Sequence, residues 1–120
     1  MESPQFRLVF GVSRIEYDPN KEERNRKEKK YSLESAVHFL QRRMLPVPQP
    51  PLVWKGPFEE KGECRYNLMS LDDDGTVVFF VITMRANDVI RVISFRAAHE
   101  DERAVYWEQA KAVGFSYAQQ

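Results

Sequence analysis

The stretch of sequence that decides the fold is CRYNLMSLDDDGTVVFFVITMRANDVIRVISFR, residues 64–96. It contains three runs rich in β-branched and aromatic residues, and each predicts a strand: Cys64–Leu71, Thr76–Met84 and Val89–Arg96. Short segments rich in Asp, Asn and Gly separate the runs, which is typical of tight turns. Because residues 77–82 are all apolar, we expect the middle run to be the central strand, covered on both faces.

The residues before this stretch predict one strand and two helices. Phe6–Tyr17 predicts the opening strand, with Gly11 as a bulge or kink. Asp18 and Pro19 mark a helix start, but residues 21–30 have no large apolar side chain, so this helix should be short and exposed. A second helix follows the N-cap Ser32 and ends near Arg42 or Arg43. Its buried stripe repeats at helical spacing: Leu33, Ala36, Val37 and Leu40.

Five of the seven prolines fall between Pro46 and Gly62. Proline lacks the backbone donor that a central strand or helix interior needs, so residues 44–62 predict a long loop. We expect it to touch the sheet edge with Leu52, Val53 and Trp54. A last helix is predicted over His99–Ala112, with three acids in its first turn.

Together these elements predict one α+β domain over residues 1–120, with the order β-α-α, a β-meander and a final α. Formal net charge is zero, so any affinity for RNA must come from a local cluster of cations. The single cysteine, Cys64, predicts neither an internal disulfide nor a zinc site, which suits the cytoplasm. The N-terminus lacks the pattern of a signal peptide, and no apolar run is long enough to span a membrane.

Three segments, in order, resemble the BrnT family of bacterial toxins. Residues 90–98, IRVISFRAA, followed by Glu102, Arg103 and Tyr106, resemble the C-terminal signature of the family. Tyr17-Asp18-Pro19 with Lys21 and Asn25 is similar to its opening, and Arg65 stands where the family carries an arginine. Where the family has Lys-His-Gly, this chain has Glu28-Lys29-Lys30, so the histidine is absent or replaced by Lys29. Residues 1–14 extend beyond the usual start, and the proline-rich loop is longer than usual.

This resemblance implies a compact fold related to RelE-type toxins, with an antiparallel sheet packed by helices. It also implies an endoribonuclease that needs no metal or other cofactor. It implies a cognate antitoxin similar to BrnA, an RNA substrate and an assembly of two toxins with two antitoxins. On this basis the candidate catalytic residues are Arg65, Arg91, Arg96 and Lys29, and the candidate RNA-binding residues are Lys21, Asn25, Lys27 and Lys30.

Each candidate also has a structural alternative. Strict alternation along a strand puts Arg91 and Arg96 on opposite faces, so they converge only if a bulge or the strand end re-aims Arg96. The arginines could instead pair with acids such as Glu100 or Glu102. The lysines of residues 21–30 are interleaved with glutamates, which is also typical of a solvated helix face.

Other polar and aromatic residues favour structural roles. We interpret His99 as a helix-entry residue, His38 as solvent-facing and Glu102 as an acid placed by the helix dipole. Arg103 and Tyr106 should brace the last helix against the sheet. Tyr66, Phe79, Phe80 and Trp107 should belong to the core rather than to a base-stacking platform. Two functions follow from these patterns: a ribonuclease toxin that halts translation, or a non-catalytic module of the same fold that binds a protein or nucleic acid.

Overall fold

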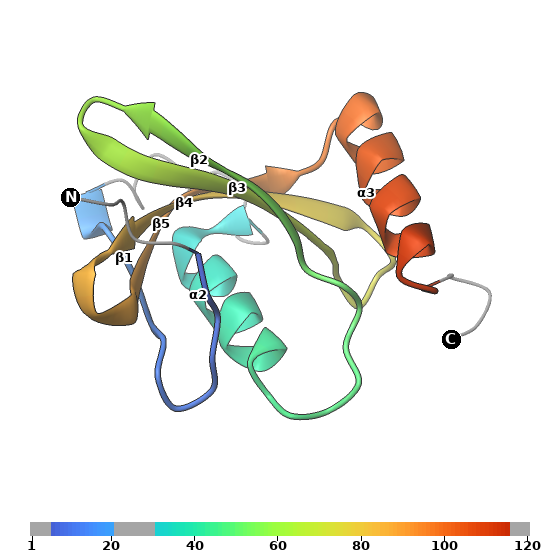
Figure 1. The fold of residues 1–120 in the computed structure, drawn as a ribbon, viewed down its shortest axis with the longest axis horizontal. Helices are drawn as coiled ribbons and strands as arrows, with labels where there is room; N and C mark the ends of the chain where they lie inside the picture. Colours follow the sequence, from blue (N-terminus) through green and yellow to red (C-terminus); the bar gives the residue numbers. More distant parts are fainter. Residues whose placement is uncertain (1–5, 21–30, 116–120) are drawn as a thin grey trace.

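The computed structural model describes residues 6–20 and 31–115. Its centre is a five-stranded mixed sheet with the spatial order β1-β5-β4-β3-β2 (Figure 1). The strands are β1 (Arg14–Tyr17), β2 (Val53–Glu60), β3 (Glu63–Leu71), β4 (Val77–Arg85) and β5 (Val89–Ala97). Neighbours from β2 to β5 are antiparallel, whereas β1 pairs with β5 in parallel. The α+β prediction is confirmed, but the sheet is mixed rather than wholly antiparallel.

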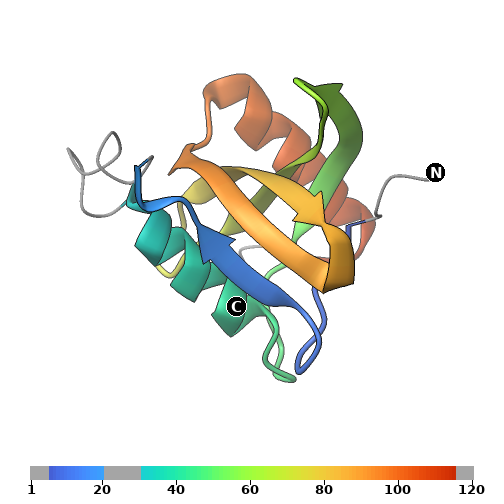
Figure 2. The same ribbon diagram turned by 90° about the vertical axis from the view of Figure 1, so that its left-hand side faces the viewer.

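Two helices cover opposite faces of this sheet (Figure 2). Helix α2 (Leu33–Arg43) packs on one face and helix α3 (Glu100–Ala112) on the other. Strand β4 is the middle strand, and its all-apolar run supplies side chains to both layers, as predicted. The short 3₁₀ helix η2 (Ala86–Asp88) joins β4 to β5.

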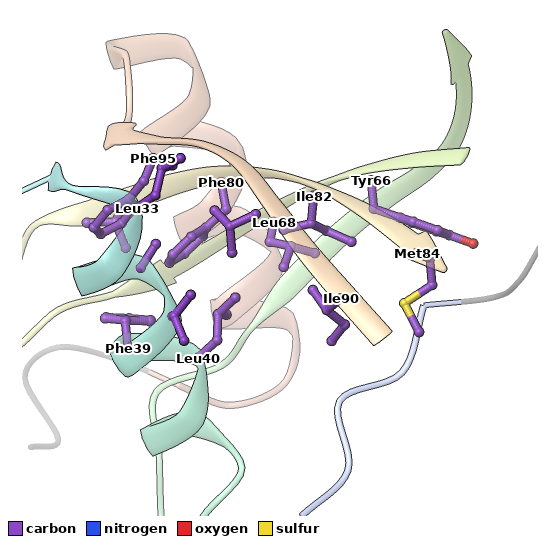
Figure 3. Close-up of a cluster of buried hydrophobic side chains, with 14 residues drawn as sticks. Leu33, Phe39, Leu40, Tyr66, Leu68, Phe80, Ile82, Met84, Ile90 and Phe95 are labelled. Atoms are coloured by element: carbon purple, nitrogen blue, oxygen red, sulfur yellow. The ribbon is translucent and has the colours of Figure 1, made fainter. Parts of the chain in front are cut away.

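The larger core lies between α2 and the sheet (Figure 3). Ser32 caps α2, since its side chain accepts a hydrogen bond from the Ser35 backbone N–H at 3.0 Å. The predicted apolar stripe of this helix is buried, and Phe39 joins it. The rings of Phe80 and Phe95 stack with centroids 4.6 Å apart, and Phe39 packs against both. Burying each large side chain contributes about 1.5–3 kcal/mol, so this layer is a main source of stability.

The opening strand is shorter than predicted. Only residues 14–17 pair with the sheet, and the backbone N–H groups of Val12 and Ser13 both donate to the Val9 carbonyl in a turn. Gly11 lies in that turn at φ +78°, a conformation that glycine adopts without steric cost, so it is not a bulge. Phe6 precedes the turn and packs on the rings of Trp54 and Tyr66.

The second half of the predicted proline loop is in fact strand β2. This edge strand is irregular between Lys55 and Phe58, where Gly56 and Pro57 break the pairing with β3. An edge strand tolerates proline because one side of its backbone has no partner, which is why the composition concealed this strand. A Cβ at Gly56, at φ +140°, would lie 2.8 Å from Tyr66 and 2.9 Å from the Arg65 carbonyl oxygen.

The first half of the loop is fixed between the two helices. Arg43, at the end of α2, donates to the Gln49 side chain at 2.7 Å, to Ser70 Oγ at 3.3 Å and to the Leu71 carbonyl. The Pro51 carbonyl accepts from Ser70 Oγ at 3.0 Å and from the buried Tyr106 hydroxyl of α3 at 2.9 Å. Burial raises the pKa of Tyr106 to about 12 and lowers the pKa of Arg43. The loop therefore links α2, β3 and α3.

Candidate active site

Arg91 and Arg96 lie on the same face of the sheet, the face that carries α3. Along β5, Ile90, Val92 and Phe95 all belong to the α2 core, so the alternation shifts between Val92 and Phe95. Figure 3 labels Ile90 and Phe95 in this core. The register explains the shift: Val92 pairs with Ile82 and Ser94 with Val81, which leaves Ile93 as an extra residue. The predicted condition for Arg91 and Arg96 to share a face, a bulge between them, is therefore met.

Arg65 joins the same face through a single row of paired residues. Arg65 of β3 is paired with Thr83 of β4, and Thr83 is paired with Arg91 of β5. Directly paired residues point to the same side of a sheet, and two strand spacings put the Cα atoms of the arginines about 10 Å apart. We call Arg65, Thr83 and Arg91 the arginine row. Two long guanidinium side chains at this separation can reach a common ligand above Thr83.

Carboxylates hold both arginines of the row. Arg65 pairs with Glu60 at 3.1 Å and with Glu63 at 3.2 Å, and its side chain is only 18% exposed. Arg91 pairs with Glu16 of the parallel strand β1 at 3.0 Å and is 33% exposed. The face therefore carries the local cations that RNA binding needs in a chain of zero net charge. Each of these cations is balanced by an acid at the rim of the sheet.

Arg96 is held separately and more firmly. Its guanidinium donates to both carboxylate oxygens of Glu102 in α3, at 2.6 and 2.9 Å, and lies 4.2 Å from the centre of the Phe79 ring. This bidentate pair lowers the pKa of Glu102 to about 2 and raises that of Arg96. Arg96 pairs with Phe79, four residues along β4 from Thr83, so it lies about 13 Å from the arginine row. The predicted alternative, pairing with Glu102, is the one observed for this arginine.

A hollow of about 210 Å³ lies between β2 and α3, and its lining includes Glu102 and Phe79, the two side chains that hold Arg96. Lys55 and Asn67, which line it, are paired in the row of residues next to the arginine row. Between the arginine row and Arg96, this face therefore carries the polar pair Lys55 and Asn67 beside the apolar Val81.

Two further arginines at this end of the sheet were missed by the sequence analysis. Arg85 is two residues beyond Thr83 on β4, and Arg14 is two residues before Glu16 on β1. Both line a shallow hollow of about 350 Å³ with Glu16 and Val89. Alternation from Thr83 places Arg85 on the face of the arginine row, a signal that was available once β4 was recognised as a strand.

The remaining candidates have structural roles or lie outside the described residues. Lys21, Asn25, Lys27, Lys29 and Lys30 belong to residues 21–30, which the structure does not describe. His99 is the N-cap of α3 and donates its backbone N–H to Glu102 at 2.7 Å, while His38 is exposed beside Glu34. Tyr66, Phe79 and Phe80 are buried, as predicted, whereas Trp107 is only partly buried and packs against the α3 core. Tyr106 is also buried. Arg103 donates to the Ala98 carbonyl at 3.0 Å, which ties α3 to the end of β5.

Within the described ranges, no three His, Cys, Asp or Glu side chains are grouped so that they could hold a metal ion. No helix in those ranges is long and apolar enough to cross a membrane.

Comparison with known proteins places this chain among the ribonuclease toxins of type II toxin–antitoxin systems. Residues 17–102 match the model of one such family, described as the ribonuclease toxin BrnT, and the chain belongs to that family. The matched region contains the arginine row, Arg96 and Glu102, and the resemblance drawn from the sequence is confirmed. Membership of this family implies an antitoxin partner. No curated protein matches the chain.

Proposed function

We propose that this protein is an endoribonuclease that cleaves messenger RNA without a metal ion and thereby inhibits translation. The observation that carries the proposal is the arginine row, in which the register brings Arg65 and Arg91 to either side of Thr83 on one face. Arginine suits this task because its planar guanidinium matches two phosphate oxygens at once.

The reaction begins with attack of a ribose 2′-oxygen on the adjacent phosphorus. The new P–O2′ bond forms as the P–O5′ bond breaks, a base takes the 2′ proton and an acid protonates the leaving 5′-oxygen. Negative charge grows on the phosphoryl oxygens, where Arg65 and Arg91 stabilise it. Arg96, farther along the face, holds a neighbouring phosphate, and the hollow beside it leaves room for the strand.

Residues 21–30 supply the rest of the site in this proposal. Lys29 contributes a proton or a positive charge in place of the family's histidine, and Lys21, Asn25, Lys27 and Lys30 guide the RNA backbone. Replacing Lys29 by alanine should slow cleavage, whereas replacing Lys27 or Lys30 should mainly weaken RNA binding and reduce its dependence on salt.

The implied antitoxin is, in this proposal, a small BrnA-like protein that covers the face of the sheet that carries the arginine row. Two toxins and two antitoxins form the inactive complex, and the protein acts in the cytoplasm, where messenger RNA is translated.

Cleavage in EDTA tests the proposal. The purified chain, freed of antitoxin, is incubated with a defined RNA, and the ends of the products are identified. Fragments with 2′,3′-cyclic phosphate and 5′-hydroxyl ends support the mechanism. An intact RNA with a folded protein overturns it.

A non-catalytic interaction module is the second candidate, and one observation favours it. Arg65, Arg91 and Arg96 all pair with carboxylates of the same chain, so none of them requires a phosphate for charge balance. A folded protein that binds its antitoxin but leaves RNA intact would support this function.

A further inference from the structure

Thr83 carries an unusual polar atom at the centre of the arginine row. Its Oγ1 is the one buried side-chain oxygen or nitrogen in residues 6–20 and 31–115 for which no hydrogen-bond partner is found. The residue is only 4% exposed and is paired on one side with Arg65 and on the other with Arg91.

A hydroxyl in this position is costly to the folded protein. A buried donor without a partner destabilises the folded state, whereas valine has nearly the same shape and carries no polar atom. Valine also suits a central strand at least as well as threonine. In the free protein, the Thr83 hydroxyl therefore does not stabilise the fold.

The surroundings favour an oxyanion as the missing partner. Among the described residues, carboxylates at the rim of the sheet hold both cations of the row: Glu60 and Glu63 pair with Arg65, and Glu16 pairs with Arg91. A phosphate placed between the guanidiniums would compete with these carboxylates for the same N–H groups. Its remaining oxygen would then face the centre of the row, where Thr83 can donate.

We propose that Thr83 is a third donor to the phosphodiester held by Arg65 and Arg91. This inference rests on the proposed function because it uses the same site, and it adds a substrate-contacting residue that the sequence analysis did not select. The hydroxyl donates to a nonbridging phosphoryl oxygen, and the hydrogen bond strengthens as charge accumulates on that oxygen.

The test compares Thr83→Val with Thr83→Ser. Valine removes the donor with little change of shape, and serine keeps the donor. The chain has one other threonine, Thr76 immediately before β4, so Thr76→Val is the matched control for the same chemical change away from the row.

Two readouts separate this inference from the proposed function. The first is the affinity for inorganic phosphate and for a DNA oligonucleotide, which carries phosphodiesters but no 2′-hydroxyl and is not cleaved. The second is the single-turnover rate of RNA cleavage in EDTA. We expect Thr83→Val to weaken binding of both probes about tenfold and to slow cleavage at least as much. Thr83→Ser and Thr76→Val should stay within about threefold of the wild type.

Thr83→Val should also raise the unfolding temperature, because it removes an unsatisfied buried group. Unchanged probe affinity in Thr83→Val overturns the inference, even where Arg91→Ala abolishes cleavage and so supports the proposed function. Thr83-dependent binding of phosphate without any RNA cleavage supports the inference and overturns the proposed function. Failure of the wild type to bind either probe overturns the inference.

Discussion

Arg91 and Arg96 share one face of the sheet although they are five positions apart, an odd interval that regular alternation would put on opposite faces. The extra residue, Ile93, lies between two consecutive pairs of the β4–β5 ladder and reverses the alternation after it. Without this bulge, Arg96 would point into the layer that holds Phe80 and α2, where a guanidinium would be buried at high cost. One residue thus keeps Phe95 in the core and places Arg96 beside Glu102 of α3.

The rim carboxylates should limit the affinity of the site for RNA. We expect Glu16→Gln and Glu63→Gln each to strengthen binding of a non-cleavable oligonucleotide several-fold at low salt, because phosphate no longer competes with a carboxylate. The logarithmic salt dependence should become steeper by up to about one unit. Glu34→Gln on α2, on the opposite face, is the control and should bind as the wild type does. Binding titrations at several salt concentrations measure the effect, and unchanged slopes in the rim variants would refute it.

The Arg96–Glu102 pair should make the free energy of unfolding depend on pH in the acid range. The pKa of Glu102 falls from the ordinary 4.5 to about 2 in the folded protein, mainly because Arg96 donates to it. Its contribution is therefore complete above pH 4.5 and is lost as the pH falls from 4.5 toward 2. Glu102→Gln should cost about 1–2 kcal/mol in the free energy of unfolding at pH 7, and the difference should shrink near pH 2.

Urea unfolding at both pH values measures this difference, with Glu108→Gln, exposed on the same helix, as the control for removing an acid. A Glu102→Gln cost that stays constant between pH 7 and pH 2 would show that the carboxylate charge does not contribute.

The contacts of the proline loop should matter for stability rather than for chemistry. Arg43→Met removes the donor to the Leu71 carbonyl and to Gln49, and we expect a loss of about 2–3 kcal/mol. Tyr106→Phe should cost only about 1 kcal/mol, because Ser70 still donates to the Pro51 carbonyl. Thermal unfolding measures both. A larger loss for Tyr106→Phe than for Arg43→Met would contradict this ranking.

The irregular part of β2 should depend on glycine. Gly56→Ala forces a side chain into a backbone with φ +140° and places its Cβ 2.8 Å from Tyr66. We expect a loss of at least about 2 kcal/mol in the free energy of unfolding, from backbone strain and the clash together. Gly62→Ala, at φ +76° with nothing within 4 Å of the added Cβ, is the control for strain alone and should cost less. Equal losses in the two variants would show that contact with Tyr66 does not matter.

Local patterns predicted much of the fold, and the errors have physical causes. The apolar run of β4, the stripe of α2 and the acidic start of α3 are short-range signals, and all three elements were predicted correctly. Strand β2 was missed because proline argues against strands in general, although an edge strand accepts it. The parallel pairing of β1 with β5 joins residues about 75 positions apart, and no local pattern specifies it.

The site was predictable only in part. The three arginines came from the family resemblance, but their arrangement depends on register. The apolar pair Val92-Ile93 interrupts the alternation of β5 and was the available sign of the bulge. The turn at residues 72–76 pairs Leu71 with Val77, and counting back along both strands then pairs Arg65 with Thr83. This pairing could have been predicted from the sequence. The rim carboxylate Glu16 could not be assigned, since its contact with Arg91 requires the β1 pairing.

The most direct test of the arginine row is the single-turnover rate of RNA cleavage in EDTA for Arg91→Ala beside Arg42→Ala. Arg42 lies on α2, on the opposite face, so it controls for the loss of an arginine. With both variants folded, we predict that Arg91→Ala is slower than the wild type by about 10²–10³, as for removal of one oxyanion donor, and that Arg42→Ala is unchanged. Equal rates for the two variants would contradict the account and place the chemistry elsewhere on the protein.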